Sequence, residues 1–241
     1  DCELAKNGMV NDGIIATQLG LHGIPDLAEK IILERDLSLL EDFNCRYHIS
    51  QISSSKSVDI INQKKNFVNF TTGVSINNLS LNENDIGDFK TFLKLSPPLR
   101  TEEDRVSLIN AINKDLINVI VSDHKPEDEE SKRLTFSQAA TGASGIETLL
   151  PLALELFHNE SVKLFKIIEL LTSNPAKILK INKGNLSIGN DADFCIVDLY
   201  KPWVVKKEKM FSKSKNTCIE DKKLQGKVTN TFVKGEELFK I

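Results

Sequence analysis

The sequence predicts an α/β fold built from parallel strands that are joined by helices. Between residues 26 and 123, strand-like and helix-like segments alternate, which is the order that parallel strands with crossover helices require. Polar residues directly follow each strand-like segment, as they do where several strands end at one site. The residues alone leave two architectures open, an open doubly wound sheet and part of a (β/α)8 barrel.

Local patterns assign the elements before residue 77. Apolar residues recur with helical spacing after Asp26, which we expect to cap a helix. Two runs rich in β-branched and aromatic residues predict strands. In order, we expect a loop over 1–22, a helix over 27–43, a strand over 45–52, a helix over 53–65 and a strand over 67–76.

A third strand–helix unit is predicted after a long polar stretch. Residues 77–100 close with Ser-Pro-Pro-Leu-Arg, where two prolines disfavour helix. Thr101 and Asp104 have the capping-box spacing, which predicts a helix over 101–115. The apolar run within 117–123 predicts a strand. Neither G-x-G-x-x-G nor G-x-x-x-x-G-K-[ST] follows any of the strands, so the commonest nucleotide-binding open sheets lack support.

The pattern changes after residue 130. Helices are expected over 145–157 and 161–181, the second interrupted at Asn174-Pro175. Residues 184–199 and 227–241 contain short strand-like runs with Gly and Asn-Asp turns, which predict a small β appendage. We place the domain boundary between residues 182 and 183.

Charge and cysteine usage narrow the classes of function. Thirty-one basic and 34 acidic residues are interspersed and give a net charge of −3, so we expect no nucleic-acid or membrane partner. The four cysteines stand singly, which argues against a disulfide scaffold or a thiolate zinc site and fits the cytoplasm. Cys45 and Cys195 are expected in the core. Because the chain opens in polar sequence without methionine, we expect a fragment that lacks an N-terminal part.

Asp123 is the strongest candidate for chemistry. It directly follows a β-branched run, so its carboxylate either binds a metal and takes a proton from bound water, or caps a turn. His124 is a ligand or bonds to backbone, and it points away from Asp123 if both continue the strand. Arg100 either binds a carboxylate or anchors a loop. Gly142 and Gly145 precede a helix, where backbone N–H groups either bind an anionic oxygen or simply begin the helix.

The motifs SPPLR, SDHKP and GIETLLPLAL occur in this order and are followed by NPAKIL and ADF. Together with RYHISQISSSKSV, they resemble the C-terminal half of the dihydroorotase family, within the metal-dependent amidohydrolases. The resemblance covers nearly the whole chain. It implies the last three strand–helix units of a (β/α)8 TIM-type barrel with its closing helices over 1–182, and a small β-sandwich appendage over 183–241.

The resemblance also implies the roles of single residues. Asp123 matches the aspartate that is both a metal ligand and a proton shuttle in the family. Ser96, Glu127, Thr141 and Gly142 match substrate-binding positions, although Ser96 stands where many members have asparagine and Glu127 where a histidine is usual.

Other departures concern the metal. Gln51 occupies the position of a usual histidine ligand, and an amide is a poorer zinc ligand than imidazole. Asn77 and Asn78 replace a histidine-rich stretch. The family binds one or two Zn²⁺ ions, and for this chain we expect at most a mononuclear or altered site.

The implied activity is reversible hydrolysis of dihydroorotate to N-carbamoyl-aspartate in pyrimidine biosynthesis, by a cytoplasmic enzyme. One alternative is a catalytically degenerate scaffold that holds aspartate transcarbamoylase. Another is a cyclic-amide hydrolase of the hydantoinase or allantoinase type. A homo-oligomer and a complex with aspartate transcarbamoylase are both expected possibilities, and the fragment alone is not expected to be active.

Overall fold

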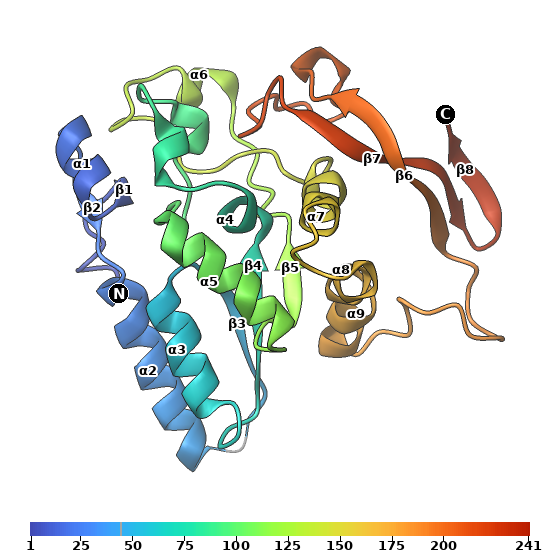
Figure 1. The fold of residues 1–241 in the computed structure, drawn as a ribbon, viewed down its shortest axis with the longest axis horizontal. Helices are drawn as coiled ribbons and strands as arrows, with labels where there is room; N and C mark the ends of the chain where they lie inside the picture. Colours follow the sequence, from blue (N-terminus) through green and yellow to red (C-terminus); the bar gives the residue numbers. More distant parts are fainter. Residues whose placement is uncertain (44) are drawn as a thin grey trace. The chain divides into compact units, whose positions relative to one another are not determined.

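The structure is a computed structural model that describes residues 1–43 and 45–241, and it confirms the α/β fold (Figure 1). The chain forms two compact units. The first contains residues 1–146 and 211–218, and the second contains residues 147–210 and 219–241. The expected domain boundary after residue 182 and the β-sandwich stay predictions.

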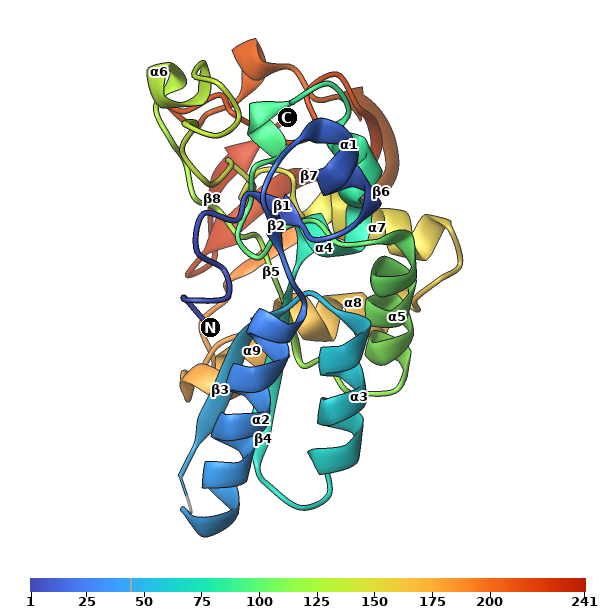
Figure 2. The same ribbon diagram turned by 90° about the vertical axis from the view of Figure 1, so that its left-hand side faces the viewer.

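Three parallel strands form the larger sheet of the first unit, as expected. They are β3 (Tyr47–Ile52), β4 (Phe70–Ser75) and β5 (Val119–Val121), with β4 in the middle. Helices α2 (Leu27–Asp42), α3 (Ser55–Lys64) and α5 (Glu102–Asn113) lie side by side next to this sheet (Figures 1 and 2). The segment between the second and third strands adds α4 (Ile76–Ser80) and two 3-10 turns, Glu83–Ile86 and Thr91–Leu93. Helix α6 (Glu129–Lys132) follows β5.

The helix starts show which capping predictions are correct. Thr101 and Asp104 form the expected reciprocal capping box at the start of α5. Asp26 is the N-cap residue of α2, as predicted, but its side chain makes no capping hydrogen bond. Asp26 instead forms an ion pair with Lys56, at 2.8 Å.

The predicted loop over 1–22 is also wrong. The structure contains two short parallel strands, β1 (Val10–Asn11) and β2 (Gly23–Ile24), connected through α1 (Ile14–Leu19). Arg100 is buried and explains how strands of two residues are held in place. Its Nη1 donates to Asn11 Oδ1 at 2.8 Å and to the Ile24 carbonyl at 2.6 Å. Arg100 is therefore an anchor between segments, the second of its two expected roles.

The second unit combines three helices with an antiparallel sheet. The helices are α7 (Leu149–His158), α8 (Leu164–Leu171) and α9 (Ser173–Leu179), and the strands are β6 (Phe194–Val204), β7 (Lys223–Val233) and β8 (Glu236–Lys240). The helix break falls at Thr172, before Asn174-Pro175, because Pro175 lies in the first turn of α9, where its missing N–H costs nothing. Helix α7 packs on β7 so closely that a Cβ on Gly226 would lie 2.4 Å from Leu154 Cδ1.

The cysteines are free, and two of them are placed differently from the prediction. Cys45 lies just before β3 and Cys195 lies on β6, and both are exposed. Their expected burial is therefore wrong. Within the described part of the chain, no helix has the length and apolar character that crossing a bilayer demands.

The spacing of β3 and β4 depends on Gly73. A Cβ at this position would lie 2.2 Å from the Ser50 carbonyl oxygen, which is backbone and has little freedom to move. We expect Gly73→Ala to lower the free energy of unfolding by about 2 to 3 kcal/mol through overpacking. Urea denaturation of the protein measures this. Gly13→Ala is the matched control, since a Cβ there meets only Asn11 Nδ2 at 3.8 Å, and it should stay within about 0.5 kcal/mol of the wild type. Equal stability of the two variants would contradict the strand spacing.

Candidate functional site

The ends of the three parallel strands bring three polar side chains together. Gln51 lies on β3, Ser75 ends β4, and Asp123 follows β5 by two residues. The Gln51 amide donates from Nε2 to Asp123 Oδ1 at 3.1 Å, and the Ser75 hydroxyl donates to Oδ2 at 3.3 Å. The ends of the three strands therefore share one polar site, as the polar residues at the strand ends predict. We call these three residues the Asp123 cluster.

The backbone of Asp123 is unusual. Its φ of 49° lies in the left-handed region, which few residues other than glycine adopt. Directly after it, His124 forms a parallel bridge with Ala143, and the Lys125 N–H donates to the Ala143 carbonyl at 2.9 Å. The turn at Asp123 therefore ends the strand and redirects the chain toward the 143–146 segment, so the two residues do not continue one strand. Backbone in sparsely populated regions is concentrated at functional sites.

Burial raises the pKa of the Asp123 carboxyl above its ordinary value. Hydrogen bonds from Gln51, Ser75 and Asn77, together with the charge of Lys125, oppose this increase without cancelling it. The carboxyl therefore holds a proton at a higher pH than an exposed aspartate does. A carboxyl of this kind is suited to exchanging protons with a reacting group.

His124 bonds to backbone, which was one of its two expected roles. Its Nδ1 accepts hydrogen bonds from the N–H groups of Gly145, at 3.2 Å, and Ile146, at 3.4 Å. The same bonds decide the role of the Gly145 amide. The Gly145 N–H donates to the His124 imidazole, so it is not available to bind an anionic oxygen at the helix start.

A second group of expected site residues is joined through Asn216. The Glu127 N–H donates to Asn216 Oδ1 at 3.4 Å, and Asn216 Nδ2 donates to the Gly142 carbonyl at 3.2 Å. Thr141, next to Gly142, is half-buried. Ser96 is exposed and makes no hydrogen bond to this group or to the Asp123 cluster in the described residues. The substrate-binding roles of Ser96, Glu127, Thr141 and Gly142 stay predictions.

Two buried lysines donate hydrogen bonds to carbonyl groups of the 137–142 segment, and no local sequence pattern indicates either of them. Lys94 Nζ donates to the carbonyls of Ser137 and Ala139, at 2.9 and 2.8 Å. Lys132, which is 1% exposed, donates from Nζ to the carbonyls of Ala140 and Gly142, at 2.7 and 2.9 Å. Burial lowers the pKa of Lys94, and it lowers the pKa of Lys132 to about 8.

The chain's own residues do not fit a complete metal site. Across residues 1–43 and 45–241, no three His, Cys, Asp or Glu side chains lie together in a way that could hold a metal ion. In the Asp123 cluster the only strong ligand is one carboxylate, and its neighbours are an amide and a hydroxyl that direct hydrogens toward it. Protein zinc sites use three or four nitrogen, sulfur or carboxylate ligands.

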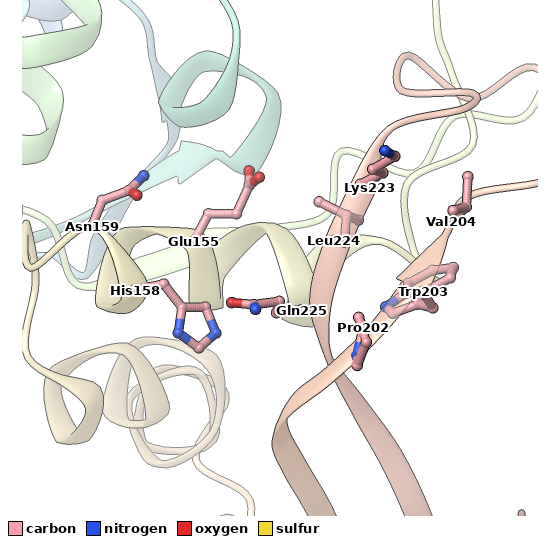
Figure 3. A pocket seen from close by; sticks show the side chains of 9 residues that line it. All are labelled: Glu155, His158, Asn159, Pro202, Trp203, Val204, Lys223, Leu224 and Gln225. Atoms are coloured by element: carbon pink, nitrogen blue, oxygen red, sulfur yellow. The ribbon is translucent and has the colours of Figure 1, made fainter.

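The second unit contains a cavity of about 490 Å³ between α7 and the β6–β7 pair (Figure 3). None of the expected site residues lines it. Its acid, Glu155, is paired with Lys222 at 2.8 Å. The ring of His158 contacts the rings of Phe157 and Tyr200, with centroid distances of 5.3 and 5.5 Å, and its buried Nε2 has no hydrogen-bond partner in the described residues. The Asp123 cluster remains the candidate site, because Asp123 and Gln51 lie there and none of the expected site residues lines this cavity.

Comparisons with known proteins agree on one family. Residues 12–238 match the model of the amidohydrolase family. The chain is 40% identical over 241 residues to a protein named dihydroorotase from Ehrlichia canis, covering 99% of this chain and 54% of the relative. It is 39% identical over 237 residues to a dihydroorotase from Acetivibrio thermocellus, covering 98% of this chain and 56% of the relative. The chain thus spans about half the length of the curated relatives that it matches.

Solved structures share the fold. The L-hydantoinase (dihydropyrimidinase) from Arthrobacter aurescens superposes with a TM-score of 0.85 at 26% identity, covering 99% of this chain and 53% of that one. The dihydropyrimidinase from Brevibacillus agri NCHU1002 gives a TM-score of 0.84 at 20% identity, over 90% of this chain and 50% of that one. The second likeness concerns the fold alone.

The lowered pKa of Lys132 predicts how stability depends on pH. The folded value is about 8 and the ordinary value is 10.5, so between these pH values the unfolded chain binds the extra proton and stability rises with pH. Relative to Lys132→Met, the wild type should gain up to about 3 kcal/mol of unfolding free energy from pH 8 to 10.5. Urea denaturation of both proteins at several pH values measures the difference. Parallel curves would show that the pKa of Lys132 is not lowered in the folded protein.

Proposed function

The chain belongs to the amidohydrolase family, and from this premise we propose that it is part of a cyclic-amide hydrolase of the dihydroorotase type. The observation that carries the proposal is the Asp123 cluster, a half-buried carboxylate with a raised pKa at the meeting point of three parallel strands. Several relatives named dihydroorotase, at 36–41% identity over nearly the whole chain, support this substrate class. The likeness to the L-hydantoinase supports a (β/α)8 barrel.

The reaction is the reversible hydrolysis of dihydroorotate to N-carbamoyl-aspartate. The oxygen of a water molecule bonds to the ring amide carbon, the carbon–nitrogen bond breaks, and one proton moves from the water to the leaving nitrogen. Asp123 accepts that proton and then delivers it. A carboxylate with a raised pKa is a stronger base than an ordinary aspartate, which favours the first step, and its acid form holds the proton until the leaving nitrogen accepts it.

The family implies a divalent metal ion, and we propose zinc. The described residues offer Asp123 as a ligand and little else, so the other ligands and part of the substrate site belong to the half of the relatives that this chain does not span. Gln51 stands at the position of a usual histidine ligand, and its amide donates a hydrogen bond to the Asp123 carboxylate. The proposal is therefore a site with no more than one metal ion.

Four residues outside the cluster are proposed to form the substrate site. They are Ser96, Glu127, Thr141 and Gly142. The Gly142 N–H donates to the Lys94 carbonyl at 2.9 Å, and the Gly142 carbonyl is taken by Lys132 and Asn216. The proposed role of Gly142 is to let the loop pass close to Lys125, because a Cβ there would lie 2.6 Å from the Lys125 carbonyl oxygen at a φ of 137°. Thr141, next to it, is proposed to contact the substrate directly.

A second candidate function is a scaffold without catalysis, for example one that holds aspartate transcarbamoylase. Two observations favour it. The Gln51 amide donates a hydrogen bond to the Asp123 carboxylate, at the oxygen that a metal ion would otherwise contact. Asn78, in the stretch where histidines were expected, is buried and donates to the Pro98 carbonyl at 2.9 Å, which anchors the loop before Arg100.

Substituting Asp123 separates the enzyme from the scaffold. In the whole protein, Asp123→Asn keeps the size of the side chain and removes the proton acceptor, so kcat for dihydroorotate hydrolysis should fall by a factor on the order of 10² to 10⁴. Ser75→Ala removes one donor to the carboxylate and leaves the acceptor, so its loss should be much smaller. An Asp123→Asn variant as active as the wild type would rule out this mechanism.

Metal binding tests the role of Gln51. Dialysis against Zn²⁺ followed by elemental analysis should give at most one zinc ion per wild-type chain. Gln51→His supplies an imidazole and should increase the bound zinc, because imidazole is a good zinc ligand and an amide is not. Two zinc ions in the wild type, or no increase in the variant, would contradict the single-metal site.

A further inference from the structure

We propose that residues 211–218, here called the clasp segment, position the two loops that carry Glu127 and Gly142, with Asn216 as the positioning residue. The inference rests on the proposed function, because it takes these two loops as substrate-binding. It adds a determinant of substrate affinity that lies about 70 to 90 residues further along the chain than the loops themselves.

The clasp segment belongs to the first compact unit although the chain on both sides of it belongs to the second. Asn216 is 3% exposed and Thr217 is 1% exposed. Cys218 donates from Sγ to the Phe92 carbonyl at 3.2 Å. The segment is therefore packed into the unit that contains the Asp123 cluster.

Asn216 connects the two loops through opposite ends of one amide. Its Oδ1 accepts from the Glu127 N–H at 3.4 Å, and its Nδ2 donates to the Gly142 carbonyl at 3.2 Å. Its backbone carbonyl also accepts from the Ser144 N–H at 2.9 Å. A carboxamide is an uncharged side chain that carries a donor and an acceptor in one plane. It can therefore satisfy an N–H of one loop and a carbonyl of another without burying a charge.

Ser214 strengthens the link to the first loop. Its hydroxyl donates to the Glu127 carbonyl at 2.6 Å. Both backbone groups of Glu127 thus bond to the clasp segment, the N–H to Asn216 and the carbonyl to Ser214. The position of this residue is set by the clasp segment.

The buried lysines hold only one of the two loops. Lys94 and Lys132 donate to carbonyls between residues 137 and 142. The two loops are also joined by the Lys125 N–H, which donates to the Ala143 carbonyl at 2.9 Å. Asn216 adds a link at Glu127 and Gly142 themselves. Small errors in the positions of binding groups are costly to an enzyme, so loss of this bridge should weaken substrate binding more than it slows the chemical step.

The experiment uses Asn216→Asp in the whole protein. The variant keeps the acceptor for the Glu127 N–H, loses the donor to the Gly142 carbonyl, and sets a negative charge against that carbonyl. We expect the KM for dihydroorotate to rise at least about tenfold while kcat changes less than about threefold. Hydrogen exchange of the amides over 142–146 should accelerate about tenfold or more, with the amides of β3 and β4 unchanged.

Two further variants serve as comparison. Asn182→Asp changes an exposed asparagine of the second unit, whose Nδ2 bonds only to Asn190 Oδ1 among the described residues, and it should leave KM and exchange over 142–146 unchanged. Ser214→Ala removes one hydroxyl and tests the clasp segment even where Asn216→Asp fails to fold. It should raise KM in the same direction by a smaller factor.

The outcomes separate this inference from the proposed function. If hydrogen exchange of the amides over 142–146 is unchanged in both Asn216→Asp and Ser214→Ala, the proposal that the clasp segment positions the loops is overturned, whatever the activity. Faster exchange with an unchanged KM overturns the positioning role and leaves a purely structural contact. A wild-type protein that neither binds nor hydrolyses dihydroorotate overturns the proposed function, and the exchange measurement, which needs no substrate, still decides whether Asn216 fixes the loop.

Discussion

A carboxylate that is partly withdrawn from water needs hydrogen-bond donors, and this requirement governs the arrangement of the three-stranded sheet. Asp123 is half-buried, and Gln51 and Ser75 direct hydrogens at its two oxygens. Those donors come from different strands, and they converge because Gly73 lets β3 and β4 approach closely. The fold and the chemistry of the site therefore depend on the same few contacts.

A second set of buried charges has the opposite sign and solves a different problem. Loop carbonyls turned toward the interior need donors, and the ammonium groups of Lys94 and Lys132 satisfy four of them. Burying a cation costs free energy, as the lowered pKa of Lys132 shows. A loop that binds substrate needs a defined shape even when holding that shape costs free energy. The cost of burying Lys132 therefore agrees with the substrate contact proposed at Thr141, in the loop that Lys132 holds.

Local patterns predicted most of the regular elements correctly. Periodicity, cap spacing and strand direction can be read directly from the sequence. They predict the three parallel strands, the capping box at Thr101 and the shared strand end where Gln51 meets Asp123. The failures have other causes. Strands of two residues are too short to show a period, and Asp26 bonds to Lys56 from another helix. Lys132 and Asn216 look like ordinary surface residues, because their burial depends on partners that no local pattern reveals.

The clasp segment also sets the order in which the molecule can be completed during synthesis. Asn216 bonds to a residue 89 positions earlier in the chain, and contacts across long separations form late because the intervening chain must first be closed into a loop. The ribosome has to release residues 147–210, most of the second unit, before the loops around Glu127 and Gly142 gain their last partners. A nascent chain that stops short of residue 211 therefore carries the Asp123 cluster without the bonds from Asn216 and Ser214 to Glu127, while Lys94 and Lys132 already hold the loop of Gly142.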